Sequence, residues 1–107
     1  MAAHGKPLEK DIQADIMKWL KKRPNSFTWK AQAGPYAPKG LPDIFHMENG
    51  RPYAFEVKRP GGEVRPLQEK AIEGLMKAGV IALVVYSLED VQYVFSDEYW
   101  RRAGEIG

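Results

Sequence analysis

The chain has 107 residues, enough for one domain with a modest hydrophobic core and too few for two. Hydrophobic residues make up 44% and charged residues 28%, the net charge is only +2, and cysteine is absent, which excludes a disulfide framework and a zinc–thiolate site. No apolar stretch is long enough to span a membrane and the first residues lack the core of a signal peptide, so we expect one intracellular, cytoplasmic domain over residues 1–107.

Residues 8–22 carry apolar side chains at helical spacing and predict an amphipathic helix. Its apolar stripe consists of Leu8, Ile12, Ile16, Trp19 and Leu20. A step of about 100° per residue places Glu9 inside this stripe. An inward carboxylate needs a metal, a lysine or water nearby, because burying an unpaired charge is costly. Glu9 therefore either belongs to a site or merely complements the positive end of the helix.

Residues 26–32 alternate between apolar and polar side chains and predict a half-buried strand. The apolar residues share one face and the polar residues the other: Phe27, Trp29 and Ala31 against Thr28, Lys30 and Gln32. If the polar face adjoins Asp43, Lys30 and Gln32 can hold a phosphate. Otherwise this face only meets solvent.

Residues 33–41 contain two glycines and two prolines and predict a loop. Tyr36 offers a stacking surface for a base, and Lys39 offers a phosphate contact. The alternative is a plain connector between two strands.

Asn49-Gly50, with apolar runs on both sides, is the strongest signal in the chain for a two-residue type I′ turn. Counting outward from this turn places Asp43 opposite Glu56, with about 4.5 Å between their Cα atoms. Lys58 lies two residues beyond Glu56 and points to the same face of the hairpin.

Two carboxylates directly opposite each other repel, so they require a cation. Carboxylate oxygens suit Mg²⁺ or Mn²⁺, and the chain has no cysteine that would favour a soft metal instead. Lys58 would lie where it can orient or help deprotonate an attacking water. Together these groups suit hydrolysis of a phosphodiester. His46 points to the opposite face by parity, and we interpret it as structural.

A basic, glycine-containing loop with Arg59 and Arg65 follows, and residues 66–78 predict the next helix. The apolar side of this helix consists of Leu67, Ala71, Ile72, Leu75 and Ala78. Gln68 projects into that side, where it either shares a polar pocket with the inward carboxylate of the first helix or is satisfied by backbone.

Residues 80–86 are continuously apolar and predict a central strand, parallel to the strand that carries Glu56. The expected core is a mixed sheet of about four strands flanked by helices. Residues 87–90 resemble a capping box for a short helix, although 93–95 could form an edge strand instead. Ser96 is expected to cap a last helix. The residues there indicate either a subunit contact or terminal core packing: Val94, Phe95, Tyr99 and Trp100.

Pro42-Asp43 followed by Glu56-Val57-Lys58 resembles the PD-(D/E)xK nuclease superfamily. Five elements in order resemble its virus-type replication-repair nuclease (VRR-NUC) branch: Glu9, the segment 40–44, Glu56-Val57-Lys58, Pro60 with the glycines that follow, and Gln68. Arg65 departs from this pattern, because a serine or threonine often caps the corresponding helix in the family.

The resemblance implies a restriction-endonuclease-like α/β core and a DNA endonuclease that depends on Mg²⁺ or Mn²⁺. It implies that the ion is held by Glu9, Asp43, Glu56 and the backbone carbonyl of Val57. Lys58 would then position the attacking water, and Gln68 would support the site. The residues expected to contact DNA are Lys30, Tyr36, Lys39, Arg59 and Arg65.

Short members of this branch act as homodimers on branched DNA such as Holliday junctions, so the resemblance implies the same partner and assembly in replication, repair or recombination. Two other functions stay open at this point. One is a nucleic-acid-binding module that keeps the fold without cleaving, and the other is a phosphodiesterase that acts on RNA.

Overall fold

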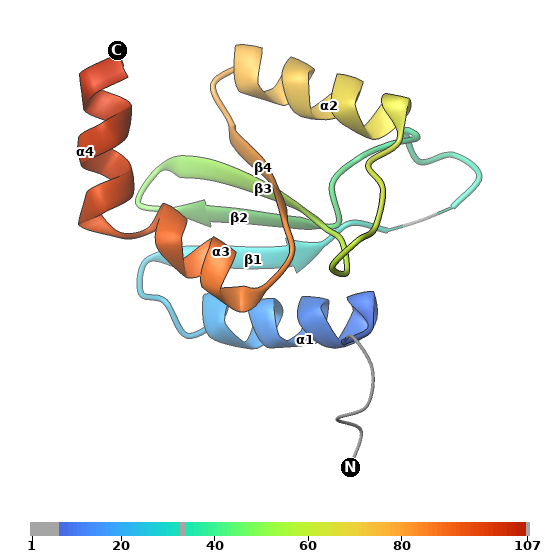
Figure 1. Ribbon diagram of the computed structural model, residues 1–107, viewed down its shortest axis with the longest axis horizontal. Helices are drawn as coiled ribbons and strands as arrows, with labels where there is room; N and C mark the ends of the chain where they lie inside the picture. Colours follow the sequence, from blue (N-terminus) through green and yellow to red (C-terminus); the bar gives the residue numbers. More distant parts are fainter. Residues whose placement is uncertain (1–6, 33, 107) are drawn as a thin grey trace.

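The computed structural model describes residues 7–32 and 34–106 (Figure 1). Its elements, in chain order, are α1 (Glu9–Leu20), β1 (Ser26–Lys30), β2 (Ile44–Glu48), β3 (Arg51–Val57), α2 (Pro66–Lys77), β4 (Ile81–Val85), α3 (Leu88–Val94) and α4 (Asp97–Ile106). Within the described ranges, no helix is both long and apolar enough to cross a membrane.

The four strands form one mixed sheet in the order β1-β2-β3-β4, antiparallel except for the parallel pair β3–β4. Helix α2 lies on one face, and α1 and α3 lie on the other (Figure 1). The expected α/β sheet flanked by helices is therefore confirmed. The expected central position of β4 is wrong, because it is an edge strand. Its continuous apolar run has a different cause, since α2 and α3 both contact it.

The hairpin forms at the predicted turn. Asn49 and Gly50 have φ angles of 50° and 80°, the positive values that a type I′ turn requires at both central positions. The register pairs Glu48 with Arg51 and Ile44 with Phe55, as counting from the turn predicts. Continuing this register by one residue places Asp43 opposite Glu56.

The main core lies between α1, α3 and the sheet face that carries Ile44 and Phe55. Ile16 and Leu20 of α1 are fully buried against this face. At the other end of the chain, Val94 is buried, and Phe95, Tyr99 and Trp100 pack against the same core. Of the two interpretations of these terminal residues, a subunit contact or core packing, the packing against the core supports the second.

The same face carries a buried polar network around His46. Its Nδ1 lies 2.7 Å from Thr28 Oγ1 and its Nε2 lies 2.8 Å from Glu48 Oε1. Arg23 donates two hydrogen bonds to the carboxylate of Glu48. Burial opposes ionisation of Glu48, but the hydrogen bonds from Arg23 and His46 outweigh it, so the pKa of Glu48 lies below its ordinary value.

Strand β1 is oriented opposite to the expectation from its alternating pattern. Its polar residue Thr28 faces the core helices, whereas Phe27 and Trp29 are 69% and 42% exposed on the other face. Lys30 pairs with Ile44 and therefore points away from the face of Asp43, so the alternative that places Lys30 beside that carboxylate is wrong.

Helix α2 also buries less than its apolar side predicts. None of its residues is buried, and Leu67 is 57% exposed. The helix covers the β4 edge of the sheet, and in the part of the chain that the structure describes no helix covers the β1–β2 half of that face.

Candidate active site

Asp43 stands directly before β2 and is tied to the end of β3. Its Oδ2 accepts a hydrogen bond of 2.8 Å from the backbone N–H of Val57. The N–H and C=O of one residue in an extended strand point to the same side, so the carbonyl of Val57 also leaves β3 on the side of Asp43. The backbone N–H of Lys58 points the other way, to the carbonyl of Val85 on β4.

Glu56 is a buried carboxylate with an unsatisfied oxygen. Its residue is 1% exposed, and among the described residues its Oε1 has no hydrogen-bond partner. Burial, followed by the negative charge of Asp43, raises the pKa of Glu56 to about 7, and the nearby Lys58 only partly opposes this shift. Ionised Glu56 therefore destabilises the site, and a bound cation would offset this destabilisation.

Two side chains contact the other oxygen of Glu56. The ammonium of Lys58 lies 3.6 Å from Oε2, and the amide of Gln68 donates a 3.0 Å hydrogen bond to the same atom. The carbonyl of Gln68 accepts the N–H of Arg65 at 2.9 Å, at the start of α2. Arg65 cannot accept a hydrogen bond with its guanidinium, so Gln68 satisfies the helix end from within.

The loop before Asp43 is packed against the start of α2 at Gly40. This glycine has a φ of +84°, and a Cβ placed there would lie 2.6 Å from the carbonyl oxygen of Leu67. The contact requires glycine for both reasons. It joins the loop that precedes Asp43 to the helix that carries Gln68.

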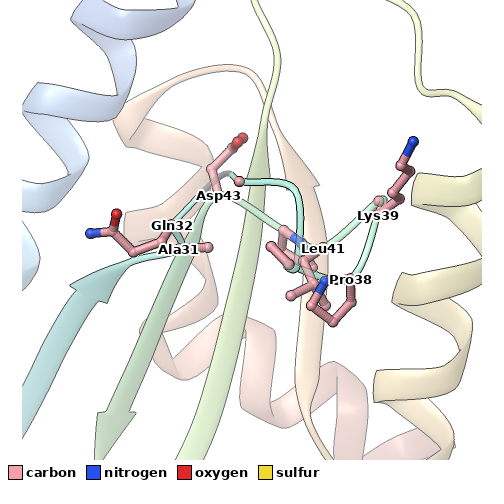
Figure 2. A pocket seen from close by; sticks show the side chains of 10 residues that line it. Ala31, Gln32, Pro38, Lys39, Leu41 and Asp43 are labelled. Carbon is pink, nitrogen blue, oxygen red and sulfur yellow. The ribbon is translucent and has the colours of Figure 1, made fainter.

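Two cavities open beside these residues. One has a volume of about 290 Å³ and is lined by Asp43 and the loop that precedes it, and in Figure 2 Lys39 lies on the side of α2. The other, of about 430 Å³, lies between Lys39, Arg65 and Gln68. Both are large enough for a phosphate group and part of a nucleotide.

The structure brings together four of the predicted catalytic residues, namely Asp43, Glu56, Lys58 and Gln68. The charge of Glu9 also raises the pKa of Glu56, but less than burial and the charge of Asp43 do. The described residues hold no group of three His, Cys, Asp or Glu side chains placed to bind a metal.

The predicted DNA contacts Tyr36, Lys39, Arg59 and Arg65 are all exposed, and Tyr36 is 97% exposed. Sequence reasoning missed Gly40 as the contact between loop and helix. A glycine just before Pro42-Asp43 was visible, but its partner Leu67 is distant in sequence.

The donor set fits a hard divalent ion. Asp43 and Glu56 supply carboxylate oxygens, the Val57 carbonyl lies on the same side, and the unsatisfied Oε1 of Glu56 is an oxygen that such an ion would coordinate. Among the described residues two carboxylates are close together here, so water would complete the coordination, as Mg²⁺ prefers.

No family model and no curated protein matches the chain. Solved structures, in contrast, match most of its length. One named "VRR_NUC domain protein" has a TM-score of 0.70 and 22% sequence identity, over 85% of this chain and 87% of that chain. Another, named "VRR_NUC domain", has a TM-score of 0.67 and 21% identity, over 81% and 92%. The chain therefore has the fold of VRR_NUC domains, which confirms the expected resemblance at the level of the fold.

Proposed function

We propose that the chain is a divalent-metal-dependent nuclease that hydrolyses phosphodiester bonds in DNA, acting inside the cell. One observation carries the proposal: the buried carboxylate of Glu56 has an unsatisfied oxygen and lies beside Asp43 and Lys58, on the fold of VRR_NUC domains. A carboxylate pair that repels is poor for stability, and such arrangements are found at functional sites.

The residues of the site would have three different roles: metal binding, positioning of water and contact with phosphate. Asp43, Glu56 and the carbonyl of Val57 would hold Mg²⁺ or Mn²⁺, and Glu9 would extend the site through water. The bound ion supplies Lewis-acid chemistry at a phosphate oxygen and makes water more acidic. Lys58 is held at 3.6 Å from Glu56 and can orient the attacking water and neutralise charge on the phosphate.

Gln68 keeps Glu56 in position from α2 by the 3.0 Å hydrogen bond to Oε2. The exposed residues Lys39, Arg59 and Arg65 lie at the loops around the site and would hold the phosphates on either side of the cleaved bond. Lys30 points to the opposite face of the sheet from Asp43, so it would contact the DNA backbone only from the edge of the sheet.

The resemblance to the VRR-NUC branch favours branched DNA, such as a Holliday junction, and a homodimer that presents two sites to one junction, in replication, repair or recombination. The +2 net charge does not by itself draw the chain to DNA, so the shape of the substrate should matter more than bulk attraction.

A cleavage assay tests the proposal. The chain is incubated with Mn²⁺ or Mg²⁺ and labelled branched, duplex and single-stranded DNA, and with RNA of the same sequence. We expect metal-dependent cuts in DNA, with branched DNA cut fastest. Cleavage of RNA alone would favour the RNA phosphodiesterase instead. Binding without cleavage of any substrate would favour the non-cleaving module.

A further inference from the structure

Three large apolar side chains lie uncovered on one face of the sheet. Phe27 and Trp29 of β1 are 69% and 42% exposed, and Met47 of β2 is 40% exposed. The register pairs Phe27 with Met47 and Trp29 with Phe45, so these four side chains share the face. We call these four residues the aromatic shelf. Their exposure is unexpected, because the alternating pattern of β1 would otherwise bury Phe27 and Trp29.

The aromatic shelf begins beside the candidate active site. Phe45 lies two residues along β2 from Asp43, so both side chains point to the same face at a separation of about 7 Å along the strand. Glu56 points to this face as well, because Phe45 pairs with Ala54 and Glu56 is two residues further along β3. A nucleic acid strand whose phosphate meets these carboxylates would therefore place a neighbouring nucleotide over the shelf.

Two rings of the aromatic shelf are already stacked on each other, and a third is tilted against them. The Phe27 ring lies 5.7 Å from that of Trp29 and is inclined to it by 42°. The Trp29 and Phe45 rings are inclined by only 14°, with centroids 5.6 Å apart. Offset parallel rings of this kind leave their outer faces open to a further flat ring. Every nucleobase offers such a ring, whatever its sequence.

We propose that the aromatic shelf stacks an unpaired base of the DNA strand whose phosphate lies at Asp43 and Glu56. The inference rests on the proposed function and names the feature of the substrate that the site selects, a nucleotide free of its pairing partner next to the cleaved bond. A base inside a duplex cannot stack there, because its neighbours cover both of its faces.

The size of the aromatic shelf favours a base over a second protein chain. Its three exposed side chains present roughly 300 Å² in total, since each has an area of about 200 Å². A stable subunit interface buries about 800 Å² on each partner. The shelf is therefore too small to form a dimer interface by itself.

Fluorescence anisotropy in EDTA, where no cleavage is expected, tests the proposal. The probes are a fully paired labelled duplex, the same duplex with a bulge of unpaired thymidines, and the same bulge built from abasic nucleotides. The proteins are the unaltered chain, Trp29→Ala and Trp29→Phe. Tyr93→Ala is the matched control, because Tyr93 is 40% exposed on α3, across the sheet. Thermal melts and sedimentation establish that each variant folds and keeps the oligomeric state of the unaltered chain.

We expect the unaltered chain and Tyr93→Ala to bind the thymidine bulge about 5- to 150-fold more tightly than the abasic bulge, the range that base–aromatic stacking gives. Trp29→Ala should lose this preference, and Trp29→Phe should keep most of it. If Trp29→Ala still discriminates between the two bulges, or if it changes the oligomeric state, the stacking role is wrong. That result would leave metal-dependent cleavage of DNA untouched. A chain that binds none of the probes and cuts no DNA with Mn²⁺ would instead contradict the proposed function itself.

Discussion

Gln68 connects the N-terminus of α2 to the buried carboxylate of Glu56. Its amide donates a 3.0 Å hydrogen bond to Oε2 of Glu56, while its carbonyl accepts the N–H of Arg65 at 2.9 Å. One side chain thus fixes both the start of a helix and the orientation of a carboxylate in the candidate site. The position of α2 on the sheet and the geometry of the site are therefore coupled.

Replacing Gln68 by alanine should affect both partners. The variant leaves Oε2 of Glu56 with Lys58 alone and frees a helix N–H, so we expect cleavage about 10- to 100-fold slower and a free energy of unfolding lower by about 1 kcal/mol. Cleavage rates and denaturant melts measure the two effects. Gln92→Ala, on α3 and partly buried, should change neither quantity. A Gln68→Ala variant that cleaves as fast as the unaltered chain would show that Gln68 does not belong to the site.

The raised pKa of Glu56 predicts an effect of pH on the stability of the metal-free protein. Below its ordinary value of 4.5 the carboxyl is protonated in both the folded and the unfolded chain, and between 4.5 and about 7 it is protonated only in the folded chain. The folded state thus binds the extra proton, and the stability from this group is lost as the pH rises through about 7.

Glu56→Gln imitates the protonated carboxyl at every pH. In EDTA we expect this variant to melt at a higher temperature than the unaltered chain at pH 8 and at nearly the same temperature at pH 4.5. The difference between the two melting curves, followed across this range, isolates the contribution of Glu56. Equal melting temperatures at pH 8 would mean that the carboxylate is not destabilising there.

Gly40 should tolerate no side chain. Gly40→Ala would place a Cβ at 2.6 Å from the Leu67 carbonyl with φ at +84°, and we expect it to lower the free energy of unfolding by about 1–3 kcal/mol and to slow cleavage. Gly74→Ala is the matched control, because it lies inside α2 with nothing within 4 Å of the added Cβ, and it should raise the free energy by about 0.5–1 kcal/mol. Denaturant melts of both variants compare them. Equal stability of the two variants would show that the loop and α2 are not held together at this point.

Lys58 and Asp43 should be needed for cleavage but not for folding. We expect Lys58→Ala and Asp43→Ala each to reduce cleavage by at least about 100-fold, as loss of a positioned proton-transfer or ligand group does, while both still fold and bind DNA in EDTA. The exposed Lys77→Ala, on the last turn of α2, serves as the control for loss of a positive charge. Unchanged cleavage by both site variants would show that the site is elsewhere.

The hairpin and the carboxylate pair could be predicted from sequence because one local signal fixes both. Asn49-Gly50 admits one tight turn, the turn fixes the register, and the register puts Asp43 and Glu56 on one face. The mixed sheet followed from an apolar strand reached through a helix. These features depend on residues close together in the sequence.

The features that could not be predicted from sequence depend on which helices cover which face of the sheet. Alternation in β1 separates its aromatic residues from its polar ones, but only the placement of α1 decides that Thr28 faces inward and Trp29 outward. An apolar run such as β4 indicates cover on both faces and not a central position in the sheet. The contact between Gly40 and Leu67 joins residues far apart in the chain, and no sequence pattern in either segment predicts it.

Titration calorimetry of Mn²⁺ into the protein, without DNA, shows whether Asp43 and Glu56 share one divalent ion. If Asp43 and Glu56 converge on one divalent ion, the unaltered chain binds Mn²⁺, Asp43→Asn and Glu56→Gln each lose most of that binding, and Glu73→Gln, an exposed carboxylate on α2, keeps it. Mn²⁺ binding that survives both site substitutions, or that is absent from the unaltered chain, would show that these two carboxylates do not form a metal site.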